Sequence, residues 1–343
     1  MKSSTPAKPP IRRAILWPHH LVFAFKHGRW LSACLLFVGM YTFFYLLQTI
    51  TSVSSSAVPI FFCLVIAYII PASHYINDQT VTAFDSLLPV LDLNSAEVAR
   101  IRLSLLKVPV RTQLVVLIIG AVAGCMHDYL LLSTAGNLLD NLALQKMGDR
   151  VMMLVTIFIW ILLTTAVSFL IRNVVIFARL AKGNITVNLL DTSALNSFAR
   201  VSVYSTLLLV GALAGFPVLL LDSDPNYLTV IPGFFAITVP MIFIFLVPLL
   251  PIRKRIKEQK SLELISIQHE INQLVTTGEH LPANSEKLAT LQPLLDYRRE
   301  IKQVQEWSFD STVMFRLAFY LFIPPLTWVG AALIERLVDA ISF

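Results

Sequence analysis

The chain has 343 residues, of which 56% are hydrophobic and only 14% charged, and its mean hydropathy is +0.71. This composition is far more apolar than that of a soluble domain, so it indicates an integral membrane protein whose surroundings are the lipid bilayer. The net charge of +6 does not indicate a nucleic-acid partner, because the basic residues flank apolar segments and are explained by helix orientation.

Residues 1–29 form a basic arm ahead of the first long apolar run. Within it, the segment from Ile11 to Phe25 combines apolar residues with Trp17, a residue type that anchors at membrane interfaces, and predicts an interfacial amphipathic helix. His19 and His20 are candidate metal ligands, but adjacent histidines seldom share one ion without further donors. We therefore expect the interfacial arrangement here, with no metal or other cofactor.

Apolar runs of roughly 20 residues, the length that crosses the hydrocarbon as a helix, recur along the chain. We expect seven spans, at 30–50, 58–73, 113–133, 151–171, 203–221, 228–250 and 313–334, of which the second is short. The predicted fold is all-α, a polytopic helical membrane protein. Residues 30–250 form a six-helix membrane region with inner arms at 75–112 and 172–202, and residues 313–343 form the final helix and a short outer tail.

The basic residues predict an orientation. With these spans, 24 of the 27 Lys and Arg residues lie on one side, and the exceptions are Lys146, Arg150 and Arg336. Because such residues accumulate on the cytoplasmic side, the N-terminus is predicted in the cytoplasm and the C-terminus outside. We expect a multi-pass protein of the cell (inner or plasma) membrane.

The third and fifth predicted helices carry the matching sequences GAVAG and GALAG. Their glycines, Gly120 with Gly124 and Gly211 with Gly215, have the GxxxG spacing that lets two membrane helices approach closely. We expect these two helices to pack against each other.

The sequence GCMHDY places His127 and Asp128 near the end of the third predicted helix. Asp128 lies four residues beyond Gly124 and continues the glycine stripe, so it should face protein. His127 lies about 100° away around the helix, so the two side chains are not a ready-made catalytic pair. Two interpretations stay open: a proton or cation relay inside the bundle, or an interfacial pair anchored by Tyr129.

Prolines fall inside the last two predicted helices. Pro232, Pro240 and Pro248 are expected to interrupt the sixth helix. Pro324 and Pro325 are expected to break the seventh near mid-membrane. Transporters use broken helices to expose backbone groups to a substrate, although prolines are also common in membrane helices without that role.

Residues 172–200 leave the fourth predicted helix and contain the run Ala181, Lys182, Gly183 and Asn184. This stretch resembles the HAMP signal-relay linker, which has an A-x-G-D run at this place. The likeness is confined to these residues, and another membrane helix follows where that family has a signalling domain. We therefore expect an interfacial elbow here.

The longest polar stretch, residues 251–310, begins with a basic collar that consists of Arg253, Lys254, Arg255, Lys257 and Lys260. From its position, the collar is expected to contact anionic lipid headgroups. Apolar residues then repeat at spacings of three and four, stop at TTGEHLPANSE and resume, which predicts a cytoplasmic helical hairpin. Either the hairpin packs on itself, or its apolar seam is shared with a cytoplasmic protein partner or a second copy.

The sequence carries no catalytic signature, because HExxH, GxSxG and GxxxxGK[ST] are all missing. Cys34, Cys63 and Cys125 lie singly in apolar runs and indicate packing, not a metal site or a disulfide framework. The sequence therefore favours a non-catalytic membrane protein that senses or scaffolds through its cytoplasmic arms. The alternative is a transporter or channel for a small solute or ion, which would need a polar path through the bundle.

Overall fold

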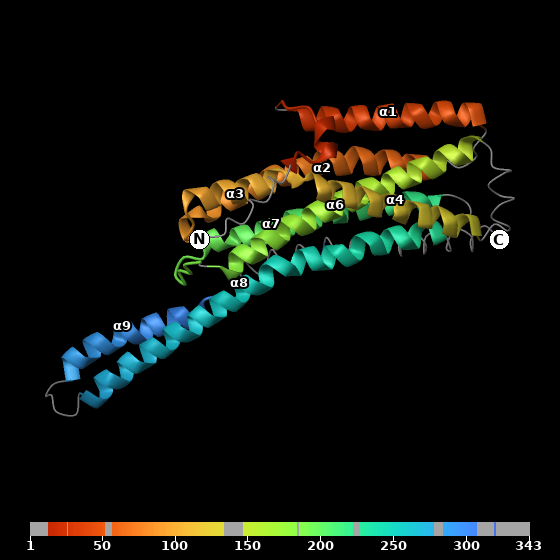
Figure 1. The fold of residues 1–343 in the computed structure, drawn as a ribbon. Helices are drawn as coiled ribbons and strands as arrows, with labels where there is room; N and C mark the ends of the chain where they lie inside the picture. The colour runs from red at the N-terminus through yellow and green to blue at the C-terminus, as the bar shows by residue number, and fades with distance from the viewer. Residues whose placement is uncertain are drawn as a thin grey trace, which may run out of the picture.

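The protein is described by a computed structural model, which covers residues 13–306, apart from 26, 52–56, 134–146, 184, 222–226 and 278–283, together with Phe319. Its elements are mostly long helices that lie side by side (Figure 1). The α-helices are α1 Gly28–Thr51, α2 Ala57–Leu87, α3 Ser95–Leu106, α4 Val110–Ser133, α6 Met147–Lys182, α7 Asn196–Leu213, α8 Tyr227–Thr277 and α9 Asn284–Gln303. Short 3-10 helices are η1 Trp17–Leu21, η2 Leu88–Val90, η3 Ser193–Leu195 and η4 Phe216–Leu221, and two strands are β1 Arg13–Ala14 and β2 Val108–Pro109.

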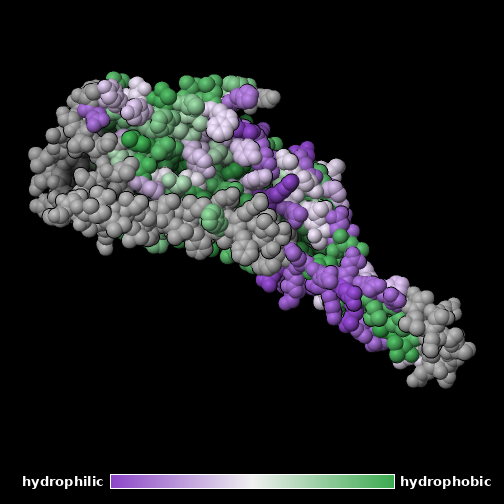
Figure 2. Space-filling view, turned by 180° about the vertical axis from the view of Figure 1, so that it is seen from behind, coloured by the Kyte–Doolittle hydropathy of each residue, from purple (hydrophilic) through white to green (hydrophobic). Residues whose placement is uncertain are grey.

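Six helices in the described part of the chain are long and apolar enough to cross a membrane: α1, α2, α4, α6, α7 and α8. The expectation of an all-α membrane protein is thereby confirmed. The expected seventh span at 313–334, with Pro324 and Pro325, lies outside the described residues. Figure 2 shows apolar side chains over the bundle, while polar side chains gather at its base and along the projection that leaves it.

The second membrane helix is much longer than the short span expected from hydropathy, because α2 continues to Leu87. Ser73, Asn77 and Thr80 follow at spacings of four and three, so they share one face, and all three are buried. The hydroxyls of Ser73 and Thr80 donate to carbonyls of their own helix, at 2.8 and 2.7 Å. These three polar residues beyond the expected end of the span are thus turned into the bundle, and the helix continues past them.

The two expected inner arms lie at the same end of the bundle and contact each other (Figure 1). The first contains the end of α2, η2 and α3, and Asn94 with Glu97 forms a capping box at the start of α3. The second contains the end of α6 and a loop that leads to α7. Ile185 of that loop pairs with Leu91, and Thr186 donates its N–H to the Val90 carbonyl at 3.0 Å.

The N-terminal segment is folded into the bundle and does not form the interfacial amphipathic helix expected for Ile11 to Phe25. Its strand β1 pairs antiparallel with β2, and the following turn η1 spans only five residues. Leu16 and His19 are buried, and the indole N–H of Trp17 donates to Thr165 of α6 at 3.4 Å. Trp17 therefore contacts protein, because the short strand pairing directs this segment between the helices.

Helix α8 runs without interruption over 51 residues, through Pro232, Pro240, Pro248 and Pro251. The expectation that Pro240 and its neighbours break the sixth membrane helix is therefore wrong. Each proline removes one backbone donor, but in an apolar environment the other backbone groups have no partner better than their own helix. The second half of α8 leaves the bundle as a long projection (Figure 1).

Helix α9 lies along this projection, and we call Pro251–Thr277 of α8 together with α9 the arm. Ile267 and Ile271 of α8 and Ile301 of α9 are buried at 3%, 8% and 0% exposure. The Tyr297 hydroxyl donates to Glu263 at 2.9 Å, and the Lys260 ammonium donates to the Val304 carbonyl at 2.7 Å. An apolar seam flanked by polar contacts therefore holds the two helices together.

Candidate functional site: a cavity at His127 and Asp128

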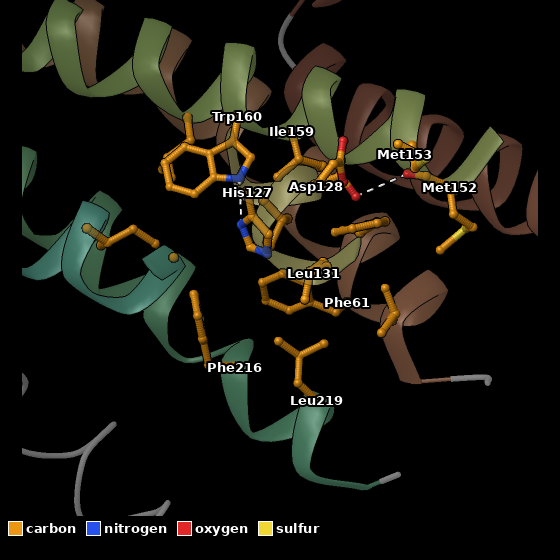
Figure 3. Close-up of a pocket in the computed structure, with 17 residues that line it drawn as sticks. Phe61, His127, Asp128, Leu131, Met152, Met153, Ile159, Trp160, Phe216 and Leu219 are labelled. Atoms are coloured by element: carbon orange, nitrogen blue, oxygen red, sulfur yellow. Dashed lines mark hydrogen bonds between the residues drawn. The ribbon is translucent and has the colours of Figure 1, made fainter. Parts of the chain in front are cut away.

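A partly open cavity of about 430 Å³ lies between α2, α4, α6, η4 and α8, which line it (Figure 3). Its walls are mostly apolar, with aromatic rings, thioethers and branched aliphatic side chains. Its lining residues are Val58, Phe61, Phe62, Val65, His127, Asp128, Leu131, Met152, Met153, Thr156, Ile159, Trp160, Leu163, Phe216, Leu219, Gly233 and Ile237. Both size and lining are those of a small-molecule pocket, for which volumes run from roughly 300 to 1,000 Å³.

The position of His127 and Asp128 follows from close contact between α4 and α6. A Cβ atom on Gly120 would lie 2.6 Å from the Cα of Ile161, and one on Gly124 would lie 2.6 Å from the Cα of Ile157. Only glycine allows this approach of the two backbones. The next turn of α4 therefore brings His127 and Asp128 against α6, at the edge of the cavity.

The glycines of α4 and α7 meet different helices, which corrects the expectation that these two helices pack through their glycines. Gly120 and Gly124 face α6, whereas a Cβ atom on Gly211 would overlap the Tyr68 hydroxyl of α2. Gly215 is less crowded, with Phe61 of α2 at 3.6 Å from such an atom. The GxxxG spacing indicates a close contact but carries no information about which helix makes it.

His127 is held by Trp160, a residue of α6 that lies 33 residues further along the chain. The indole N–H of Trp160 donates to Nδ1 of His127 at 2.9 Å, and the two rings meet edge to face at 5.6 Å (Figure 3). Because Nδ1 accepts this bond, a neutral imidazole carries its hydrogen on Nε2. That Nε2 atom is buried and has no hydrogen-bond partner in the described part of the protein.

Asp128 is equally buried, at 5% exposure compared with 6% for His127. Its Oδ2 atom has no hydrogen-bond partner among the described residues. No Lys or Arg belongs to the described lining of the cavity. The cavity therefore presents one N–H donor and one carboxyl oxygen that the described residues leave without a hydrogen-bond partner, which is unusual for buried polar atoms.

A second set of polar side chains is buried between α2, α6 and α7. Asn77, Asn173, Ser202 and Ser205 are at most 7% exposed, and each has a side-chain atom without a hydrogen-bond partner within the described residues. The ring of Phe177 on α6 contacts that of Phe198 on α7 at 5.9 Å. Since α6 and α7 are antiparallel, Asn173 and Ser202, one turn away from these rings, lie at the same level.

Asn77 belongs to this level as well, and we call the four residues the polar layer. The rings of Tyr75 on α2 and Tyr204 on α7 are 6.3 Å apart, and Asn77 and Ser202 lie two residues from them on the inner faces. Along α6, Asn173 is about 15 Å from the cavity residue Leu163. The polar layer is hardly visible in the sequence. Its only signal is the spacing of Ser73, Asn77 and Thr80 on one helix face.

The basic collar joins helix ends at the base of the bundle. The Arg255 guanidinium donates to the carbonyls of Lys182 and Gly183 at the end of α6, at 2.8 and 3.1 Å, where positive charge is favourable. Arg253 pairs with Glu306 at 3.9 Å, and Lys254 pairs with Glu258 at 3.7 Å. Lys257 is exposed, and the Lys260 ammonium donates to the carbonyls of Lys302 and Val304 at the end of α9.

His19 and His20 do not form a metal site together. His19 is buried, with Nε2 at 3.4 Å from the Ser73 hydroxyl and its ring 5.3 Å from that of His74, while His20 is exposed. In the described residues no group of three or more His, Cys, Asp or Glu side chains could hold a metal ion. Burial, with a smaller effect of His74, lowers the pKa of His19 to about 4.

No protein-family model, curated protein or solved structure matches this chain. Ala181 and Lys182 of the HAMP-like run are the last residues of α6, and the carbonyl of Gly183, the next residue, accepts a hydrogen bond from Arg255 of α8.

Proposed function

We propose that the protein is a membrane sensor that binds a small, mainly apolar molecule in the cavity and transmits its presence to the arm. The observation that carries this proposal is the continuity of α8. Gly233 and Ile237, near its start, line the cavity, and Ile267 and Ile271, near its end, pack in the arm. One unbroken helix thus connects the binding site to the arm.

The length of this connection makes it suitable for transmission. From Gly233 to Ile267 the helix extends about 50 Å, so a tilt of a few degrees at the cavity moves the arm by several ångströms. Gly233 packs against Phe216, since a Cβ atom there would lie 3.1 Å from that ring. A molecule that enters between α6 and α8 changes this packing, and α8 then tilts as a rigid element.

The arm is the output in this proposal. We place it in the cytoplasm as a helical hairpin, because the basic residues lie mainly at this end of the bundle, and we place the C-terminus of a seven-helix chain outside. The exposed Lys257 and Lys254 contact anionic headgroups beside the bundle. A cytoplasmic protein or a second copy of the chain binds the arm, and this binding depends on the position of the arm.

The test compares a filled cavity with an empty one. Spin labels at Glu270 on α8 and Arg100 on α3, in a protein without its natural cysteines, report the distance between the arm and the bundle. Ile237→Trp fills the cavity, whereas Val239→Trp adds the same ring to a side chain that is 61% exposed. We expect the distance distribution to shift only with Ile237→Trp. Identical distributions for both variants and the parent would exclude transmission through α8.

The second candidate function, transport of a small solute, is favoured by the polar layer. Asn77, Asn173 and Ser202 offer polar atoms without a hydrogen-bond partner among the described residues, on the arm side of the cavity, which a solute would meet on leaving it. Asn173→Leu would then abolish flux in proteoliposomes and leave binding in the cavity unchanged. Transport is excluded if the purified protein moves no solute that it binds.

A further inference from the structure

We infer that the ligand of the cavity is an amphiphilic amine, with its protonated nitrogen at Asp128 and its apolar body against the aromatic wall. This inference rests on the proposed function, because it takes the cavity to be a binding site. It goes further by assigning a charge and a chemical class to the ligand.

The positive charge of the ligand follows from the absence of a cationic side chain in the described lining of the cavity. Asp128 is 5% exposed and its Oδ2 atom has no hydrogen-bond partner among the described residues. An isolated carboxylate in an apolar interior is strongly unfavourable, and the described lining contains no Lys or Arg to offset it. An ammonium group supplies both the opposite charge and N–H donors. An anionic ligand would add a second negative charge beside the first.

His127 does not take the place of this cation. Its Nδ1 atom accepts the Trp160 N–H, so the ring is neutral with its hydrogen on Nε2. A neutral imidazole does not compensate the charge of Asp128. The Nε2–H of His127 still needs a hydrogen-bond acceptor, which the ligand can supply. The preferred amine therefore carries an oxygen atom, such as a hydroxyl, a short distance from its nitrogen.

The walls of the cavity are suited to the apolar body of such an amine. The rings of Phe61 and Phe216 meet edge to face at 5.0 Å, and Trp160 borders the cavity beside His127 (Figure 3). The faces of aromatic rings attract cations, most strongly where water is excluded. The thioethers of Met152 and Met153 adapt to apolar bodies of different shape.

The experiment uses probes with one apolar body and different head groups: 1-adamantanamine, 1-adamantanol and 1-adamantanecarboxylic acid, together with 3-amino-1-adamantanol. Binding to the full-length protein in lipid nanodiscs is measured by calorimetry at pH 7. We expect the amine to bind at least tenfold more tightly than the alcohol or the acid, and the amino alcohol to bind more tightly still.

Two variants and a control locate the site. Asp128→Asn keeps the shape of the side chain without the charge, and it should weaken amine binding at least tenfold. Leu163→Trp fills the cavity and should remove binding of every probe. Asp296→Asn changes an exposed carboxylate of α9 and should have no effect.

The outcomes separate this inference from the proposed function. If the alcohol or the acid binds as tightly as the amine, or if Asp128→Asn leaves amine binding unchanged, the ligand is not a cation, although the cavity is still a binding site. If no probe binds, or if Leu163→Trp leaves binding intact, the cavity is not a binding site and the proposed function fails with the inference.

Discussion

Trp160 and His127 are joined by a hydrogen bond of 2.9 Å that crosses from α6 to α4. The bond satisfies the indole N–H, which is a donor only, and it fixes which nitrogen of His127 carries a hydrogen. It also lies directly beside the glycine contact of the same two helices. The pair therefore adds a polar contact between α4 and α6 and fixes which N–H of His127 faces the cavity.

The first prediction concerns this bond. Trp160→Phe keeps an aromatic ring but removes the N–H donor, so Nδ1 of His127 is left buried without a partner. We expect a loss of about 1 kcal/mol in stability and weaker binding of 3-amino-1-adamantanol, measured by thermal unfolding and calorimetry in nanodiscs. Trp30→Phe is the control, because Trp30 is 77% exposed on α1. Equal losses in the two variants would show that the bond contributes nothing specific.

The second prediction concerns the close contact of α4 with α6. Gly124→Ala places a Cβ atom 2.6 Å from the backbone of Ile157, so the helices must separate. Overpacking of this kind destabilises by about 1–3 kcal/mol. The matched control is Gly39→Ala, since a Cβ atom on Gly39 meets nothing within 4 Å. Thermal unfolding of both variants measures the difference, and similar midpoints would contradict the contact.

The six described spans could be predicted from the sequence because hydropathy reports directly on the cost of placing residues in lipid. The residues at which the membrane helices end could not be predicted in this way. Ser73, Asn77 and Thr80 lower the hydropathy of α2 but are buried against other helices, and local composition does not reveal such neighbours. The continuity of α8 at Pro240 depends in the same way on the surroundings of the helix, not on its sequence alone.

The site was predictable in part. His127 and Asp128 stand out as ionisable residues in an apolar run, and spacing alone shows that they do not face each other. The partner of His127 could not be inferred, because Trp160 is 33 residues distant and any of several aromatic residues would have served. The polar layer was missed for the same reason, since its four members come from three helices and only the fold brings them to one level.

The third prediction tests the orientation. In a protein without its natural cysteines, single cysteines at Ser54 or Ser223 should react with an impermeant thiol reagent added from outside, and one at Ser261 on α8 should react only after the membrane is opened. The reason is the excess of Lys and Arg at the arm end of the bundle. Labelling of Ser261 in intact cells would reverse the orientation and place the arm outside.

The fourth prediction concerns the seam of the arm. Replacing Ile267 and Ile271 by Asp puts charge between α8 and α9, where the two side chains are 3% and 8% exposed. The penalty of a few kcal/mol should detach α9, so limited proteolysis should cleave the arm faster while the bundle stays intact. Ile265→Asp is the control, because Ile265 is 66% exposed on the same helix. Unchanged cleavage of the double variant would mean that α9 is held in place by other contacts.

The last prediction concerns pH and the N-terminal segment. His19 has a folded-state pKa of about 4, against 6.5 for the free side chain, mainly because burial disfavours its charged form. Below pH 6.5 the released segment binds a proton that the packed one does not, so the packing loses stability as the pH falls from 6.5 toward 4. The loss amounts to about 3 kcal/mol at the lower limit.

Proteolysis within residues 13–25 should therefore accelerate between pH 7 and pH 4.5. His19→Gln has no proton to take up and should flatten this dependence, whereas His20→Gln, which changes an exposed neighbour, should keep it. If His19→Gln and the wild type show the same acceleration, another group releases the segment.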